Sequence, residues 1–144
     1  MIFRAGGLLT FTRAILVFSI LTISCSLGQN LQWQSFGPHR IAKLPPNEPF
    51  VLTGDFNTTP DSKVHAMLTQ HLKDAWLAAP HQSGPDKTFH DFTGKPTERI
   101  DWILVRGFKV EDVRTVTTHE GQIYPSDHFP VMADLQWPKG DSPR

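Results

Sequence analysis

The stretch VLTGDFNTTPDS, from Val51 to Ser62, decides how the chain is interpreted. It begins with an apolar run that lacks polar alternation, which is typical of a β-strand buried on both faces. The run ends at Gly54, and Asp55 and Asn57 follow directly in a polar turn. These two residues are either ordinary turn residues or parts of a functional site, because the end of a strand holds side chains rigidly.

One helix and three more strands are expected after this strand. A capping residue, a proline and then an apolar stripe predict a helix from Thr59 to about Ala79. Residues 80–99 predict a long loop. Apolar patterns predict strands in RIDWILVRGF (99–108), VEDVRTVTT (110–118) and FPVMADLQW (129–137). This order of elements places the chain in the α/β (α+β) class.

The composition excludes several classes of protein. The 144 residues fit one domain at most, and 14 basic residues balance 14 acidic residues. Because no overall positive charge attracts nucleic acid, any phosphate chemistry needs a local site. The single cysteine, Cys25, excludes an internal disulfide framework and a cysteine-based zinc cluster.

The first 28 residues contain Arg4 and Arg13, no acidic residue, and the apolar run AILVFSILTIS. This pattern predicts a signal-like or anchor segment in residues 1–28, and the run is short for a membrane span. An ordinary buried segment or a misplaced start is the alternative. The domain then covers residues 29–138, and residues 139–144 form a tail. The protein would be exported or membrane-associated if the signal is genuine, and cytoplasmic otherwise, with no stable membrane span.

Two more polar clusters lie in or beside the predicted strands. Asp101 lies within an apolar strand, where a carboxylate needs a partner, and a salt bridge to Arg99 or Arg106 is the structural alternative to a functional role. Asp127 and His128 precede the last strand. They are either an ordinary pair of loop residues or a carboxylate beside an imidazole that acts as a general acid or binds phosphate. Together, the carboxylates, the amide and the imidazole are the groups that metal-assisted hydrolysis of a phosphate ester needs.

The motifs GDFN (54–57), RIDWILV (99–105) and SDHFPV (126–131) resemble, in order and approximate spacing, the C-terminal half of the endonuclease/exonuclease/phosphatase superfamily. The resemblance covers about residues 41–137. It implies a partial DNase I-like four-layer sandwich, mainly one mixed or antiparallel sheet with a flanking helix. It also implies a divalent-metal-dependent phosphoesterase that hydrolyses a phosphodiester or phosphomonoester with an activated water. The substrate would be a nucleic acid, a sugar or inositol phosphate, or a lipid head group.

The resemblance also implies a role for each matching residue. Asp55 would orient or deprotonate the attacking water and contribute to a site for Mg²⁺ or Mn²⁺. Asn57 would hydrogen-bond the scissile phosphate, and Asp127 would contact the metal. His128 would bind the phosphate and stabilise the transition state, and Asp101 would pair with His128.

A further motif, TFHDFTG (88–94), resembles the substrate-side loop of the family, where His90 would touch the substrate. A surface histidine without a function is the alternative. The family also takes a glutamate metal ligand from its N-terminal half, and no counterpart precedes Ile41. Glu48 lies in a proline-flanked turn and does not replace it. We therefore expect a sheet that lacks its usual packing partner, and an inactive truncated fragment or a half-domain that needs a complementary chain is the alternative function.

Overall fold

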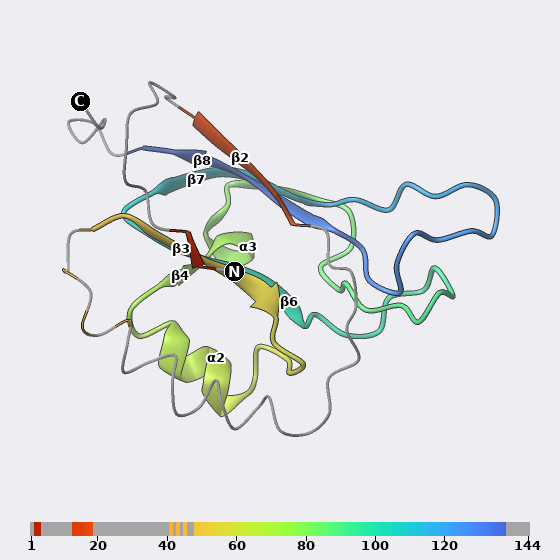
Figure 1. Ribbon diagram of the computed structural model, residues 1–144, viewed down its shortest axis with the longest axis horizontal. Helices are drawn as coiled ribbons and strands as arrows, with labels where there is room; N and C mark the ends of the chain where they lie inside the picture. Colours follow the sequence, from red (N-terminus) through yellow and green to blue (C-terminus); the bar gives the residue numbers. More distant parts are fainter. Residues whose placement is uncertain are drawn as a thin grey trace.

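Two four-stranded sheets packed face to face form the frame of the computed structural model, which describes residues 2–3, 13–18, 41, 43, 45 and 48–137 (Figure 1). In the first sheet all neighbouring strands are antiparallel, and the order is β1 (Ile2–Phe3), β3 (Phe50–Asp55), β6 (Asp101–Arg106) and β4 (Lys73–Asp74). The order in the second sheet is β2 (Arg13–Phe18), β8 (Val131–Gln136), β7 (Lys109–Thr115) and β5 (His81–Ser83). Only the β5–β7 pair is parallel among these described strands.

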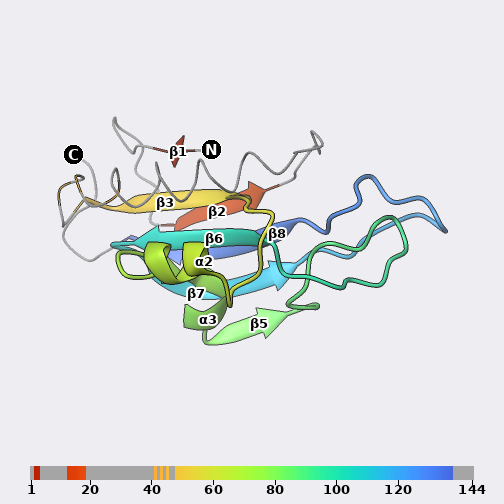
Figure 2. The same cartoon turned by 90° about the horizontal axis from the view of Figure 1, so that it is seen from below.

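The two faces of the first sheet contribute to two separate cores. One face packs with residues of helix α2 (Lys63–Leu68), and this core contains Phe50, Leu52, Val64, Leu68, Trp102 and Leu104. The other face packs on the second sheet, in a core that contains Val51, Ile103, Val105, Val110, Val113, Val131, Ala133 and Leu135. Figure 1 shows β6 between α2 and the second sheet, and Figure 2, seen from below, shows α2 in front of β6. Both faces of this sheet are covered. Every residue of β3 and β6 except the last one of each strand is therefore buried, as their apolar sequences predict.

The α/β class and the DNase I-like sandwich are confirmed, but the expectation of mainly one sheet with an uncovered face is wrong. The missing layer is built largely from residues 109–136, in which β7 and β8 pair in antiparallel register. In β8 every second residue is buried, so Val131, Ala133 and Leu135 cover the first sheet, while the residues on the opposite side are half-buried. The chain therefore supplies its own second sheet.

The predicted helix from Thr59 to Ala79 is divided into two short helices. Ser62, rather than Thr59, caps α2, and its Oγ accepts a hydrogen bond from the backbone N–H of His65 at 3.2 Å. The chain then forms the short strand β4 before helix α3 (Ala75–Ala78) begins. The single helix predicted from the apolar stripe is therefore wrong.

The physical reason for this break is the residue Asp74. Its backbone pairs with Leu104 of β6, and its carboxylate accepts a hydrogen bond from the backbone N–H of Trp76 at 3.0 Å, which caps α3. The same carboxylate forms a buried ion pair with Arg99. A continuous helix would forgo the pairing with β6 and the cap of α3, and the apolar stripe alone does not reveal either contact.

The strands β1 and β2 lie within residues 1–28. β2 pairs with β8 along its whole length, from Arg13 opposite Gln136 to Phe18 opposite Val131. This placement corresponds to the alternative of an ordinary segment of the fold, and the export signal stays a prediction. The rest of residues 1–28 and the tail 139–144 lie outside the described residues. In the described part of the chain, no helix reaches the length and apolarity that crossing a bilayer requires.

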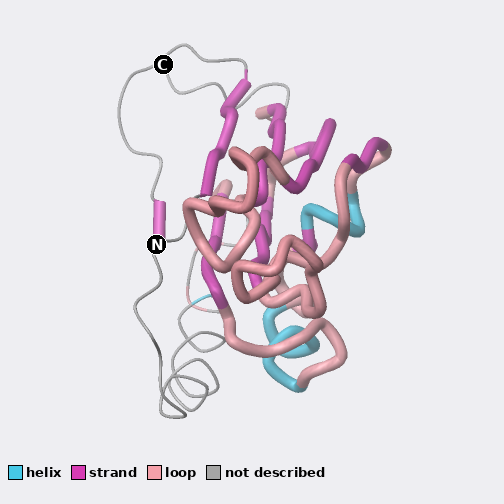
Figure 3. Tube along the Cα trace, turned by 90° about the vertical axis from the view of Figure 1, so that its right-hand side faces the viewer, coloured by secondary structure: helices cyan, strands magenta, loops and turns pink. Residues whose placement is uncertain are grey.

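Two long loops, residues 84–100 and 116–130, extend from the same end of the sandwich and lie side by side (Figures 1 and 3). Isolated bridges join Phe89 to Glu98 within the first loop and Phe89 to His128 of the second. The backbone N–H of Phe129 also donates to the carbonyl of Thr88 at 2.9 Å. The two loops are therefore held together by backbone hydrogen bonds at the end of the sheets where Asp55 and Asp101 lie.

Candidate active site

The strands β3 and β6 place two carboxylates opposite each other. Asp55 is the last residue of β3 and Asp101 the first of β6, and the two are register partners. Directly opposed residues of antiparallel strands project to the same face, where like charges destabilise the pair. Asp101 is only 5% exposed and Asp55 is half-buried. This end of the sheet therefore favours a positive group between or beside the two carboxylates.

The loop of residues 116–130 supplies an imidazole to this pair. His128 Nδ1 lies 2.7 Å from Asp101 Oδ2, and both side chains are buried. The backbone N–H of His128 donates to Ser126 Oγ at 3.1 Å, and its ring makes an edge contact with Phe89. Thr88 Oγ1 accepts a hydrogen bond from the backbone N–H of Asp101 at 3.3 Å. The orientation of His128 is therefore fixed from both loops.

The resulting cluster has the chemistry of a cation site. One potential ligand atom each from Asp55, Asp101 and His128 lies within 4.8 Å of the other two. Asp101 Oδ1 is buried and has no hydrogen-bond partner among the described residues. A buried carboxylate oxygen without a donor is costly, and oxygen-preferring divalent cations are bound by such atoms. The two carboxylates of this group thus fit a divalent metal ion, with His128 beside them as the hydrogen-bond partner of Asp101.

The charges of the cluster shift the pKa values of two of its members. Burial raises the pKa of Asp55, the hydrogen bond from the Asn57 backbone opposes this effect, and the charge of Asp101 adds to it, so that the pKa lies above its usual value. Burial lowers the pKa of His128, but its hydrogen bond to Asp101 and the neighbouring carboxylates outweigh burial and raise it. The site therefore favours a protonated imidazole beside a carboxylate that resists ionisation.

Asn57 and Asp127 lie next to the cluster. The backbone N–H of Asn57 donates to Asp55 Oδ1 at 2.8 Å, and Asn57 has a left-handed φ of 51°, which asparagine tolerates better than most residues. The charge of Asp127 acts on both Asp55 and His128. Asp127 is not in the group of three potential ligands, where Asp101 is found instead. The metal contact of Asp127 and the phosphate contact of Asn57 stay predictions.

His90 is 1% exposed, so the alternative of a surface histidine is wrong. Its ring stacks on Phe129 at a centroid distance of 4.0 Å and also contacts Tyr124. Nδ1 accepts a hydrogen bond from the backbone N–H of Gly94 at 3.3 Å, and Nε2 is buried without a partner in the described part of the chain. Burial lowers the pKa of His90, which favours the neutral ring. The substrate contact of His90 stays a prediction.

The salt-bridge alternative for Asp101 is also wrong, because both arginines have other partners. Arg99 donates to both carboxylate oxygens of Asp74, at 3.2 and 2.9 Å. Arg106 donates to the backbone carbonyls of Pro45 and Glu48. Asp101 is therefore left to pair with His128.

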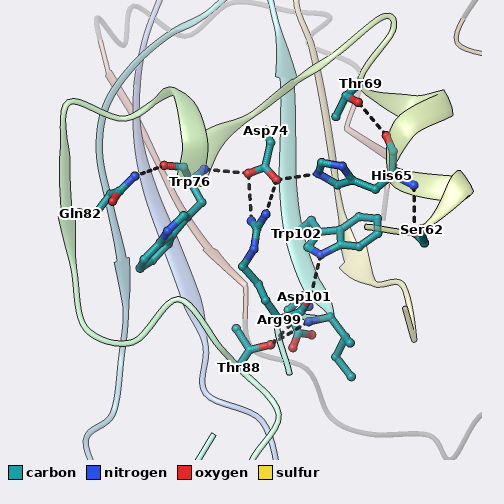
Figure 4. A network of polar contacts seen from close by, with 11 residues as sticks. Ser62, His65, Thr69, Asp74, Trp76, Gln82, Thr88, Arg99, Asp101 and Trp102 are labelled. Carbon is teal, nitrogen blue, oxygen red and sulfur yellow. Dashed lines mark hydrogen bonds and ion pairs between the residues drawn. The ribbon is translucent and has the colours of Figure 1, made fainter. Parts of the chain in front are cut away.

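The sequence interpretation missed a second polar network, centred on Asp74 (Figure 4). His65 Nε2 lies 2.8 Å from Asp74 Oδ2, and Trp102 Nε1 donates to the carbonyl of Arg99 at 3.0 Å. The apolar stripe of the expected helix runs through Val64, Leu68 and Ala75, so His65 and Asp74 lie beside it and the local pattern gives no signal for their contact. It also does not reveal Arg99, which is the second charged partner of Asp74.

Comparisons with known proteins agree with this geometry. A family profile described as "Endonuclease/Exonuclease/phosphatase family" matches residues 9–128. The chain belongs to this family. The match begins well before Ile41, so it includes β2 and extends beyond the C-terminal portion that the three motifs indicated.

Solved structures of bacterial proteins have the same fold. An endonuclease/exonuclease/phosphatase from Bacteroides vulgatus is 32% identical, with a TM-score of 0.66, over 76% of this chain and 45% of that chain. A functionally unknown conserved protein from Enterococcus faecalis is 29% identical, with a TM-score of 0.67, over 78% of this chain and 46% of that chain. A mannosyl-6-phosphatase from Bacteroides thetaiotaomicron is 26% identical, with a TM-score of 0.61, over 75% and 44%. The chain thus spans less than half the length of these relatives. No curated protein matches it.

Proposed function

We propose that the protein is a divalent-metal-dependent phosphoesterase that attacks its substrate with an activated water. The observation that carries this proposal is the convergence of Asp55, Asp101 and His128 within 4.8 Å at the end of β3 and β6. Membership of a family of nucleases and phosphatases supports the same reaction class. A divalent cation, Mg²⁺ or Mn²⁺, bound by these carboxylates would act as a Lewis acid on the phosphoryl oxygen.

The side chains around the metal site have separate roles in the reaction. Asp55 is half-buried at the mouth of the site, and it orients the attacking water and accepts its proton. Asp101 binds His128 through Nδ1, so Nε2 of the same ring is the nitrogen that donates to the phosphoryl oxygen. The raised pKa of His128 keeps this donor charged as negative charge develops. Asn57 and Asp127 hold the phosphate and the metal from the two flanking turns.

The substrate is a small phosphate ester rather than long nucleic acid. The chain carries equal numbers of basic and acidic residues, and non-specific DNA affinity requires many lysine and arginine contacts. The relative from B. thetaiotaomicron, named for its action on a mannosyl 6-phosphate, supports a sugar phosphate as the substrate of this chain too. The charge balance thus disfavours long nucleic acid, and the relative favours a phosphomonoester.

The test is an assay of purified protein with Mg²⁺ on p-nitrophenyl phosphate and bis-p-nitrophenyl phosphate, with Mn²⁺ as an alternative. Asp55→Ala should lower kcat by at least about 10²-fold, because the water loses its base. Chelation with EDTA should abolish the activity, and added Mg²⁺ should restore it.

Asp86→Ala is the matched control, since Asp86 is an exposed aspartate outside the cluster. It should retain the full rate. Equal rates for the wild type, Asp55→Ala and a protein-free blank on both esters would refute the proposal.

A further inference from the structure

We propose that Phe92 is a specificity-determining residue, whose ring packs against the alcohol part of the phosphate ester. The alcohol it fits is one with a flat apolar face, such as the C–H face of a sugar ring. This inference rests on the proposed function and adds the part of the substrate that the cluster of Asp55, Asp101 and His128 does not contact.

The first observation is the backbone of the turn from His90 to Thr93. The N–H of Thr93 donates to the carbonyl of His90 at 2.9 Å, which closes a four-residue turn. Asp91 and Phe92, the two central residues, have φ values of 48° and 57°. Such a turn selects glycine, asparagine or aspartate, because larger side chains are strained in the left-handed region. Asp91 matches this preference of the turn, but Phe92 does not.

The second observation is that the fold gains little from this phenylalanine. Phe92 is 55% exposed, and both of its neighbours in sequence, Asp91 and Thr93, are exposed. A strained aromatic residue without burial is destabilising, and such strain persists where the residue serves a function. A single exposed apolar residue is ordinary on a surface, but one held in this conformation is not.

The third observation is that the turn cannot rearrange to relieve the strain. The N–H groups of His90 and Asp91 both donate to the carbonyl of Asp127, at 2.8 and 3.1 Å. The buried ring of His90 also holds the turn in place, because it stacks on Phe129 and accepts a hydrogen bond from the backbone N–H of Gly94. The left-handed conformation is therefore imposed by the same contacts that hold the loop of His128.

These contacts also set the position of the turn that carries Phe92 relative to the segment that carries His128. The N–H of Asp91 donates to the carbonyl of Asp127, and Asp127 precedes His128, so the turn that carries Phe92 is bonded to the segment that carries the site. In this proposal the alcohol of an ester bound at His128 lies beside this turn and meets the exposed ring of Phe92. An aromatic ring binds the apolar face of such a group and leaves the phosphate chemistry unchanged.

The experiment compares Phe92→Gly with the wild type in two measurements. Glycine adopts the left-handed region without strain, so the melting temperature should rise. Loss of the ring should raise KM for a hexose 6-phosphate about 2- to 10-fold, the range expected for one aromatic contact. KM for methyl phosphate, which has no flat face, should stay within about 2-fold, and kcat for both esters should be unchanged.

Two controls separate the ring from other effects. Phe92→Tyr keeps the aromatic face and should keep the wild-type KM for the hexose phosphate. Leu77→Ala removes an apolar side chain that is 67% exposed on α3, and it should change neither KM.

Each other result has a definite meaning. A higher melting temperature with an unchanged hexose KM refutes the role of Phe92 and leaves the phosphoesterase standing. A lower melting temperature for Phe92→Gly shows that the ring is structural and also refutes the inference. If the wild type releases phosphate from neither ester with Mg²⁺ or Mn²⁺, the proposed function fails, and the inference fails with it.

Discussion

Asp74 and Asp101 each pair with a histidine in the interior, yet their carboxylates are satisfied to different degrees. Asp74 contacts His65, both terminal nitrogens of Arg99 and the backbone N–H of Trp76 (Figure 4). Asp101 contacts His128 through one oxygen, and its other oxygen is buried without a partner among the described residues. A fully bonded buried network makes a structure rigid, whereas an unsatisfied buried oxygen marks a place for a ligand. We infer that the Asp74 pair serves the fold and the Asp101 pair serves the reaction.

The largest expected effect concerns stability and the pair at Asp74. Arg99→Met should lower the free energy of unfolding by about 3–5 kcal/mol, because it leaves a buried carboxylate without its cation. Urea denaturation followed by tryptophan fluorescence measures the change. Arg114→Met, at an exposed arginine of β7, is the control and should change stability by less than about 0.5 kcal/mol. An equal loss of unfolding free energy in Arg99→Met and Arg114→Met would contradict a structural role for the Asp74 network.

The second effect concerns activity and the pair at Asp101. Asp101→Asn should reduce kcat by about 10²-fold, about 2.7 kcal/mol, because the imidazole of His128 loses its anionic partner. Its free energy of unfolding should change by less than about 1 kcal/mol, since the substitution also removes a like charge opposite Asp55.

Asp74→Asn is the matched variant for this prediction. It should unfold at a clearly lower urea concentration, since Arg99 loses its counter-ion. At a temperature where it is folded, it should retain most of the wild-type kcat. If Asp101→Asn proved the less stable variant and Asp74→Asn the less active one, the assignment of the two pairs would be reversed.

The sequence could predict the strands that carry the site because their signals are local. The apolar runs of β3 and β6 are typical of strands covered on both faces, and the alternation in β8 predicts its buried side. The family motifs at the ends of these strands also indicated that Asp55, Asp101 and His128 would meet. Strand ends and short motifs are contained in single stretches of sequence, so no knowledge of distant contacts was needed.

The features that the sequence did not predict depend on partners far along the chain. The helix was expected to run to Ala79 because nothing near Asp74 indicates that Arg99, 25 residues away, is its ion-pair partner. The alternative of a surface position for His90 is wrong because its aromatic neighbours Tyr124 and Phe129 belong to another loop. Burial of a polar side chain is set by tertiary packing, which overrides a local pattern.

A smaller effect would sharpen the comparison within the Asp74 network. His65→Phe keeps an aromatic ring against Trp102 and removes the hydrogen bond to Asp74 Oδ2. That oxygen retains its bond from Arg99, so the loss of stability should be only about 1 kcal/mol. Urea denaturation beside Arg99→Met measures the difference, and a loss as large as that of the arginine variant would show that the imidazole, not the guanidinium, holds Asp74.

The smallest expected effect is a pH dependence of stability at His128, measured with EDTA present so that no metal binds. The pKa of His128 is raised in the folded state, so its ion pair with Asp101 stabilises the protein fully below the unfolded value of about 6.5. This contribution should be lost as the pH rises through the raised pKa. The lowered pKa of His90 acts with the opposite sign in the same range, so the raw stability curve mixes the two groups.

The difference in unfolding free energy between the wild type and His128→Gln separates them, because His90 is present in both proteins. This difference should be largest near pH 6, just below the ordinary histidine pKa, and should shrink to a plateau at higher pH. A difference that grows with pH would mean that the folded state prefers the neutral ring of His128. Asp101 would then not act as the partner of a charged imidazole, and the two aspartate–histidine pairs would no longer differ in the way that assigns the reaction to one of them.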